Sequence, residues 1–444
     1  MARSARARAT EARLAAQGCG ASYNLRRVTI FSDRLVPLSC LVAALLAVAV
    51  AIGGCESSQP GVIIEGDQLT VVTSAPLSGD FKAAGEAMVN GERLALADAN
   101  GRAGRFDVSL TVLNSVQGRM KISSEARVAS NARSAVLSPT SIAYIGDYDS
   151  AATAVSLPLI NQAGIAQISP LSAYPGFTGS EQAGPDEPGR FYPGGKRTFF
   201  RLAPSQVRET EAQASLQAQQ GCKESFVIYD DSPAGKRSAS AAAAALKAES
   251  VATAGISAAS TAEQGSSRLV AAVKGSKADC VAYGASINLA AAELLNQLSA
   301  NNPALKFFVG RSGDNAPFTE NLSARAQRAT LITGPGPDPQ RLSTVGSEVS
   351  KRYRRQFGSA PGIAGLYGYA AMTDVLEAIR RSGAEGNNRA RVLSALSQTE
   401  ADDSAVGRYS ITPDGDSTLT TIVVSRVVGG QLVISPFLTD AINE

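Results

Sequence analysis

Short apolar segments alternate with longer amphipathic segments along most of this 444-residue chain. The first pair is an apolar run at 69–75 followed by 84–99, where Ala84, Met88 and Ala95 recur at helical spacing. A repeated strand–helix–strand rhythm predicts a parallel, doubly wound sheet with helices on both of its faces. The pattern therefore restricts the fold class to α/β.

The same rhythm predicts where the individual elements lie. We expect strands at 69–75, 106–113, 142–145, 165–168, 226–230, 250–256, 280–283, 305–309, 329–333, 417–427 and 431–434. We expect helices at 84–99, 121–131, 151–162, 206–219, 236–247, 266–273, 289–298, 342–357, 363–381 and 389–397.

Two stretches rich in Gly and Pro, at 175–200 and 335–339, interrupt the alternation. They predict two Rossmann-like lobes that exchange segments of the chain. We expect lobe 1 to comprise 69–203 and 335–409, and lobe 2 to comprise 204–334 and 410–438. Ligands of such sheets bind at the carboxyl ends of the strands, so a ligand is expected where those ends face each other.

The N-terminus has the parts of an export signal. Basic residues at 26, 27 and 34 precede an apolar run at 41–52, and Gly53 and Gly54 precede Cys55. A Cys at this place resembles the bacterial lipobox, so we expect a signal peptide with an N-terminal extension at 1–54. Lipidated Cys55 and a flexible tether to residue 68 would follow. The alternative is a membrane-spanning or buried helix, for which the apolar run is short of roughly 20 residues.

Charge argues against one class of partner. Residues 1–54 hold seven Arg and two acids, which leaves 35 basic and 37 acidic groups in 55–444. A nucleic-acid-binding protein needs a basic face that displaces counterions. We therefore expect no nucleic-acid partner.

Several kinds of chemistry are absent from the sequence. It contains no His, which excludes Ser-His-Asp and Cys-His catalysis and zinc sites that use His. It also contains neither a Ser-x-x-Lys motif nor a Gly-rich phosphate loop. We expect no cofactor, no metal and no enzymatic activity. A carboxylate-based hydrolase stays open as an alternative, with Asp149, Asp231 and Asp314 as isolated acids in the expected site.

Two cysteines remain after the export segment and Cys55. Cys222 precedes one expected strand, and Cys280 begins another. The first and third strands of a doubly wound order are neighbours, so both thiols are expected at the amino ends of adjacent strands. In an oxidising compartment this predicts a disulfide, with two buried free thiols as the alternative.

Six short motifs then occur in a fixed order. They are VVTSAPLSGD at 71–80 with GEAMVNGERLALAD at 85–98; AYIG at 143–146 with PLINQAGI at 158–165 and ISP at 168–170; FFR at 199–201; FVIYD at 226–230; FVG at 308–310; and YGYAA at 367–371. This ordered set resembles the type I periplasmic binding proteins, and most of all their branched-chain amino acid binders.

The resemblance implies two lobes joined by three crossover segments that close on a ligand. It implies that the Ser150 hydroxyl and the backbone of Leu171, Ser172 and Ala173 bind the ligand's carboxylate. A hydroxyl and oriented amides at a strand–helix junction suit an anion. Further ligand contacts are expected from Ser78, Tyr148, Tyr174, Ala234, Ser286, Ser312 and Asp314. The alternative for Ser150 is an N-cap of the following helix, and for Tyr148 and Tyr174 it is packing at the lobe surface.

Three positions depart from the family pattern. Ala234 replaces an aromatic residue, Ala173 a Thr, and Ser312 the acid that pairs with the ligand's ammonium. An ammonium in a desolvated site needs an acidic partner, so leucine-like ligands are unexpected unless Asp314 or Asp231 supplies it.

The resemblance implies a monomeric, lipid-anchored substrate-binding protein that passes a small solute to the permease subunits of an ABC importer. A ligand-sensing receptor with the same fold is the alternative.

Overall fold

The structure is a computed structural model, and it describes residues 62–179, 182–259 and 263–443. The predicted signal peptide and Cys55 lie outside the described residues. Within these ranges no helix is both long and apolar enough to cross a membrane.

Six strands form the first sheet, in the order β2-β3-β1-β4-β5-β6. They are β1 (Gln68–Ala75), β2 (Arg102–Ala103), β3 (Phe106–Asn114), β4 (Ser141–Ile145), β5 (Ala166–Ser169) and β6 (Phe199–Arg201). All neighbours pair in parallel except β2 with β3. Six helices belong to this sheet: α2 (Lys82–Asp98), α3 (Glu125–Leu137), α4 (Ser150–Gln162), α11 (Thr344–Phe357), α12 (Gly362–Arg381) and α13 (Arg389–Leu396). We call this sheet and its helices lobe 1.

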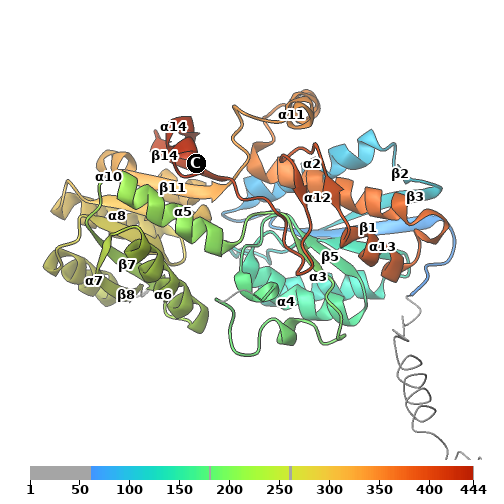
Figure 1. The fold of residues 1–444 in the computed structure, drawn as a ribbon, viewed down its shortest axis with the longest axis horizontal. Coiled ribbons are helices and arrows are strands. Elements are labelled where there is room, and N and C mark those ends of the chain that lie inside the picture. Colours follow the sequence, from blue (N-terminus) through green and yellow to red (C-terminus); the bar gives the residue numbers. More distant parts are fainter. Residues whose placement is uncertain (1–61, 180–181, 260–262, 444) are drawn as a thin grey trace, which may run out of the picture. The chain divides into compact units, whose positions relative to one another are not determined.

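Seven strands form the second sheet, in the order β15-β14-β11-β10-β9-β7-β8 (Figure 1). They are β7 (Glu224–Asp230), β8 (Ala252–Ala259), β9 (Cys280–Gly284), β10 (Lys306–Val309), β11 (Thr330–Pro335), β14 (Ile422–Val428) and β15 (Gln431–Ile434). Its helices are α5 (Gln206–Gln219), α6 (Pro233–Ala248), α7 (Glu263–Gly275), α8 (Leu289–Asn301), α9 (Ala316–Thr319), α10 (Ala324–Ala329) and α14 (Pro436–Ala441). We call this part lobe 2. Strands β12 (Glu400–Ala401) and β13 (Tyr409–Ser410) pair separately.

The order of the strands shows how the chain passes between the sheets. It leaves the first sheet after β6, builds β7 to β11 in the second, and returns to cover the first sheet with α11, α12 and α13. It then enters the second sheet again as β14 and β15, which pair antiparallel. The predicted α/β class with two mainly parallel sheets is confirmed.

Alternating side chains of β1 explain why helices cover both faces of its sheet. Val71 packs into a core that α2 and α12 share, whereas Val72 packs with Ala132 of α3 and Ile160 of α4. Successive side chains of a strand point to opposite faces, so each face buries its own helix layer. Figure 1 shows α2 and α12 next to each other over one face.

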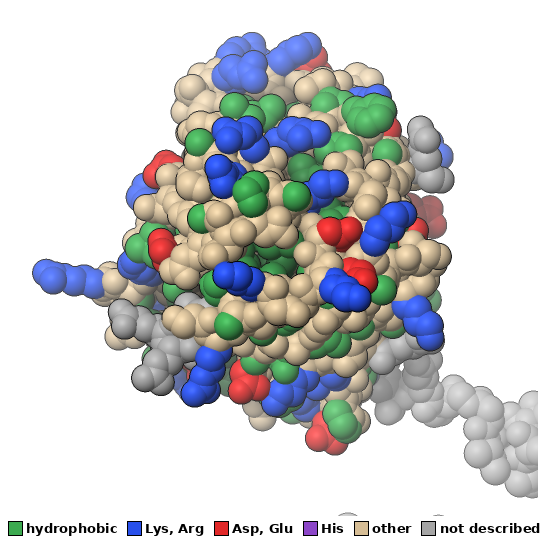
Figure 2. All heavy atoms as spheres, turned by 90° about the vertical axis from the view of Figure 1, so that its left-hand side faces the viewer, with side chains coloured by type: hydrophobic (Ala, Val, Ile, Leu, Met, Phe, Trp, Pro, Cys, Tyr) green, Lys and Arg blue, Asp and Glu red, His purple; other side chains and the backbone are tan. Residues whose placement is uncertain are grey.

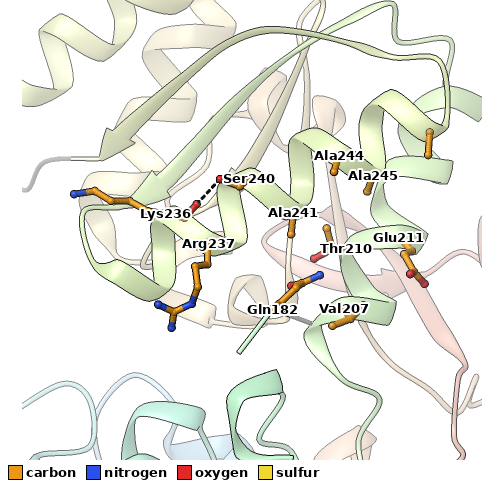
Figure 3. A pocket seen from close by; sticks show the side chains of 11 residues that line it. Gln182, Val207, Thr210, Glu211, Lys236, Arg237, Ser240, Ala241, Ala244 and Ala245 are labelled. Carbon is orange, nitrogen blue, oxygen red and sulfur yellow. Dashed lines mark hydrogen bonds between the residues drawn. The ribbon is translucent and has the colours of Figure 1, made fainter. Parts of the chain in front are cut away.

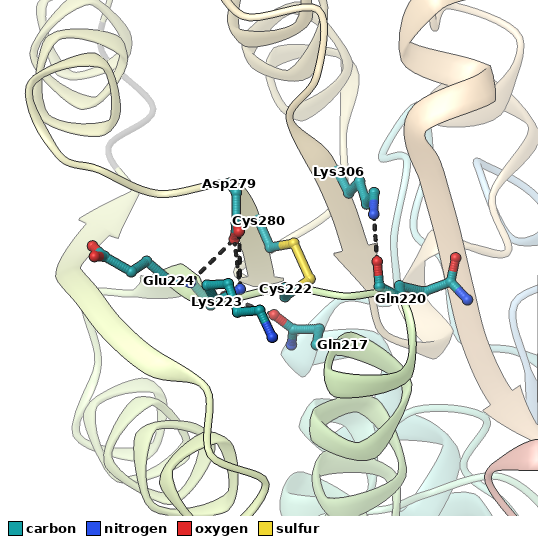
Figure 4. Close-up of a disulfide and its surroundings, with 9 residues drawn as sticks. Gln217, Gln220, Cys222, Lys223, Glu224, Asp279, Cys280 and Lys306 are labelled. Carbon is teal, nitrogen blue, oxygen red and sulfur yellow. Dashed lines mark hydrogen bonds between the residues drawn. A yellow bond between two sulfur atoms is a disulfide. The ribbon is translucent and has the colours of Figure 1, made fainter.

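The predicted disulfide is confirmed between Cys222 and Cys280, whose Cα atoms are 5.9 Å apart. Both residues are buried, and Cys280 opposes Ser225 where β9 pairs with β7. Figure 4 shows the bond beside Asp279, whose carboxylate accepts the backbone N–H groups of Lys223 and Glu224. The bridge therefore ties together the amino ends of two adjacent strands.

Candidate functional site

The loops that follow β1, β4 and β5 bring the predicted lobe 1 residues together. Ser78 is half-buried, and its Oγ accepts a hydrogen bond from Asn114 Nδ2 at 3.1 Å. Asn114 ends β3, and its side-chain oxygen also accepts the N–H of Leu77 at 3.0 Å. This asparagine therefore fixes the loop that carries Ser78.

Ser150 is not the N-cap of α4, so that alternative interpretation was wrong. Asp149 is the N-cap, because its Oδ1 accepts the N–H of Ala152 at 2.9 Å. The Oγ of Ser150 instead accepts the N–H groups of Ala173 at 3.0 Å and Tyr174 at 3.1 Å. One predicted amide donor, Ala173, and its neighbour Tyr174 thus donate to Ser150 in this structure, and these two bonds do not use the hydroxyl proton of Ser150.

The segment before Ala173 is held by buried hydroxyl groups. Ser172 is fully buried; its N–H donates to Ser169 Oγ at 3.0 Å, and its hydroxyl lies against that of Thr153. The carbonyl of Leu171 accepts a hydrogen bond from Arg311 Nη1 at 3.2 Å. Ligand contact at Leu171, Ser172 and Ala173 stays a prediction.

Four predicted residues of lobe 2 follow the carboxyl ends of its strands. Ala234 is half-buried in the first turn of α6 after β7, and exposed Ser286 follows β9. The N–H and hydroxyl of Ser286 donate to the carboxylate of Asp230 at 2.9 and 3.1 Å. Ser312 and Asp314 are both exposed in the turn after β10. The structure thus places all four at one edge of the second sheet.

Arg311 joins this edge to lobe 1, and sequence reasoning missed it. Its backbone N–H and Nε donate to Glu209 of α5 at 2.8 and 2.6 Å. Its Nη1 reaches Leu171 O, and its Nη2 reaches Pro204 O at 3.0 Å. The signal available in the sequence was an Arg directly after the FVG motif at 308–310.

Tyr148 lies where acidic groups of both lobes gather. Burial and the charges of Asp314 and Asp149 raise the pKa of Tyr148, while the charge of Arg311 opposes this. The ring of Phe81, whose centroid is 5.7 Å away, covers the Tyr148 ring. The charge of Asp314 in lobe 2 thus acts on the hydroxyl group of Tyr148 in lobe 1. Asp231, the other predicted substitute acid, pairs with Lys236 on the surface instead.

An open pocket of about 700 Å³ lies between α5 and α6. Figure 3 shows its walls, where small side chains such as Ala241 and Ala244 stand among polar and charged ones such as Glu211, Lys236 and Arg237. Ligand sites combine an enclosed shape with a few convergent polar groups. This groove is open rather than enclosed, and none of the predicted contact residues lines it, so we place the candidate site at the facing strand ends.

In the described ranges, one group of three potential metal ligands occurs, comprising Cys222, Asp279 and Cys280. Its two sulfur atoms are bonded to each other, so they are not available as thiolate ligands. Figure 2 shows Lys and Arg side chains distributed over one face of the molecule, with Asp and Glu side chains between several of them. That face is mixed in charge.

The sequence profile of the periplasmic binding protein family matches residues 68–431, so the chain belongs to this family. The chain is a solute-binding protein, and its family is non-enzymatic. No curated protein matches the chain by sequence.

Solved structures agree in fold. A leucine-binding protein from Thermotoga maritima superposes with a TM-score of 0.69 at 18% identity, over 83% of this chain and 97% of that chain. An ABC transporter substrate-binding protein from Desulfitobacterium hafniense in complex with Leu superposes with a TM-score of 0.66 at 18% identity, over 83% of this chain and 100% of that chain. A solute-binding protein of an ABC transporter from R. palustris in complex with benzoate superposes with a TM-score of 0.64 at 16% identity, over 83% of this chain and 95% of that chain. At these identities the likeness shows the type I periplasmic binding protein fold.

Proposed function

We propose that this chain is the lipid-anchored substrate-binding protein of an ABC importer, which captures a small polar solute by closure of its two lobes. The solute is an amino acid or a related amide or carboxylate. The observation that carries the proposal is the meeting of strand ends from both sheets, where Arg311 after β10 donates a hydrogen bond to the carbonyl of Leu171 after β5. A ligand at that place contacts both lobes, so its binding free energy favours the closed state.

Family membership and the named ligands of similar structures support a small solute as the cargo. We assign ligand contacts to Ser78, Tyr148, Ser150 and 171–174 in lobe 1, and to Ala234, Ser286, Ser312 and Asp314 in lobe 2. The lobes themselves are proposed to comprise 69–203 with 335–409, and 204–334 with 410–438. Ser312 stands where an acid would pair with a ligand ammonium, so leucine, isoleucine and valine are expected as cargo only if Asp314 supplies the acid instead.

A ligand screen tests this function. The purified full chain is heated with amino acids, amides, short peptides and carboxylates, and hits are measured by calorimetric titration. A ligand present at 100 times its Kd stabilises the folded state by about 2.7 kcal/mol, which a thermal shift detects. Strong stabilisation by leucine, isoleucine or valine would show that Ser312 does not exclude them.

The Tyr148→Ala variant tests whether the ligand binds at Tyr148. We expect the affinity for a hit to fall at least tenfold, because the variant removes an aromatic ring from the proposed site. Phe437→Ala is the matched control, because it removes a ring that is 80% exposed in α14. Equal affinities of the two variants would exclude a site at Tyr148.

Cys55→Ala tests the anchor separately. The variant should be released from the membrane fraction or keep its signal peptide uncut, while the purified protein binds ligand normally. Unchanged membrane attachment would contradict lipidation at Cys55, and loss of ligand binding would contradict the separation of anchoring from recognition.

A further inference from the structure

The Gly- and Pro-rich loop between β5 and β6 is built around one buried carboxylate. The side chain of Glu187 is 4% exposed. Its Oε2 accepts the N–H of Gly184 and the hydroxyl of Tyr174, each at 2.6 Å. A Cβ at Gly176 would lie 2.2 Å from this same oxygen, so the loop backbone fits closely against the carboxylate.

Two arginines from different parts of the molecule reach Glu187. Arg190, in the same loop, lies 2.7 Å from Oε1, and its side chain is 57% exposed. Arg237, in α6 of lobe 2, lies 3.6 Å from Oε2, and its Nη2 also donates to the hydroxyl of Tyr174. Glu187 therefore has one basic partner within its loop and another across the lobes.

The carboxylate is charged in this setting. Burial by itself opposes ionisation, but the hydrogen bonds from Tyr174 and Gly184 and the charges of Arg190 and Arg237 lower the pKa of Glu187. Charge-assisted hydrogen bonds are about twice as strong as neutral ones, and they strengthen where water is excluded. The contact with lobe 2 is thus an ion pair supported by a shared tyrosine hydroxyl.

The position of the contact connects it with the candidate site. The backbone N–H of Tyr174 is bound by Ser150, and Arg237 follows Ala234 within the first turns of α6. We propose that Glu187, Tyr174 and Arg237 form a clasp, which holds the lobes together at the rim of the ligand site and thereby sets the lifetime of the bound ligand. The effect on a bound ligand rests on the proposed function, whereas the contact between Glu187, Tyr174 and Arg237 does not depend on it.

The clasp joins residues of both lobes, so it favours the closed state whether or not a ligand is bound. A contact made only after closure slows ligand release more than it changes capture. Arg237 and Glu187 are positioning residues here, because the argument gives them no contact with the ligand. In contrast, Arg190 supports the loop from within and joins no second lobe.

Hydrogen exchange of the ligand-free full chain tests the clasp without any ligand. Arg237→Ala should raise amide exchange both in the loop at 184–191 and in the first turns of α6. Arg190→Ala, the matched control, removes a cation from the same carboxylate and should raise exchange in the loop alone. The same pattern for both variants would overturn the clasp, as would unchanged exchange in α6 of Arg237→Ala.

The rate of ligand release tests whether the clasp sets the lifetime of the bound ligand. The probe is L-glutamine or benzoate, whichever of the two stabilises the wild type. Arg237→Ala should raise the release rate about five- to tenfold with little change in the association rate, and Arg190→Ala should change it less than twofold. In a Glu187→Gln background, Arg237→Ala should have little further effect, because the two residues act as one unit. Additive effects would overturn the coupling. If neither probe binds, the proposed function is in question, while the exchange experiment still decides the clasp.

Discussion

Asp416→Asn probes the buried ion pair that joins β6 to the segment leading into β14. The side chain of Arg201 is 1% exposed, and its Nη2 lies 2.7 and 2.8 Å from the two oxygens of Asp416. Burial lowers the pKa of Arg201, and the charge of Asp416 opposes this. Breaking a fully buried pair costs about 3–5 kcal/mol. Because Asp416 is 31% exposed and Asn still accepts a hydrogen bond, we expect a loss of about 2 kcal/mol.

Urea unfolding followed by circular dichroism measures the loss, with Asp414→Asn as the matched control. Asp414 lies in the same segment, but its side chain is 66% exposed and its oxygen is 3.5 Å from Arg197. Surface pairs of this kind contribute about 0–1 kcal/mol, so the control should unfold at nearly the wild-type midpoint. Equal midpoints for the two variants would refute the reasoning that burial makes the Arg201 pair costly to break.

Three further predictions concern stability. The double substitution Cys222→Ala and Cys280→Ala, which opens a loop with a separation of 58 residues, should lower unfolding free energy by about 4 kcal/mol in urea; an unchanged midpoint would contradict this. Gly91→Ala should destabilise by about 2 kcal/mol or more, since its Cβ would lie 2.0 Å from a backbone oxygen of α12, whereas Gly275→Ala, in open space, should not. Burial raises the pKa of Asp374 to about 7, so its contribution to stability is full below about pH 4 and is lost as pH rises through 7. Asp374→Asn should flatten this fall in thermal unfolding between about pH 4 and 7, and an equally steep fall would contradict it.

The fold was predictable where side-chain periodicity decides structure. Successive side chains of a strand alternate between its two faces, so Val71 and Val72 are expected to pack against different helices, as they do. Long helices such as α12 are predictable because their apolar residues recur on one face. The helix predicted at 121–131 begins four residues later, because Ser124 caps it and Lys121 O accepts the N–H of Asp80 instead. Periodicity could not show this, because the capping competition depends on a loop that is distant in sequence.

The candidate site was predictable in position but not in its hydrogen bonds. Strand ends identify the loops that contain Tyr148 and Asp314. They do not show that the Oγ of Ser150 accepts the N–H of Ala173, 23 residues away, because this bond depends on how α4 packs against β5. Arg311 and Arg237 were missed for a related reason. An arginine in a turn or on a helix usually lies in solvent, and only the tertiary structure brings Glu209 beside Arg311 and Glu187 beside Arg237.

The charges around Tyr148 predict whether the ligand carries a positive or a negative charge. Arg311 is already bound to Glu209, so ionisation of Asp149 and Asp314 gives the site an excess of negative charge. Burial raises the pKa of both acids, and a cation beside them offsets this effect. A cationic group is favoured there, and a bare carboxylate is opposed. L-leucinamide should therefore stabilise the chain more than 4-methylpentanoate, which has the same branched hydrocarbon end, and Asp314→Asn should reduce this difference in thermal-shift measurements. Stronger stabilisation by the carboxylate would mean that the Ser150 hydroxyl and the neighbouring amides outweigh both acids.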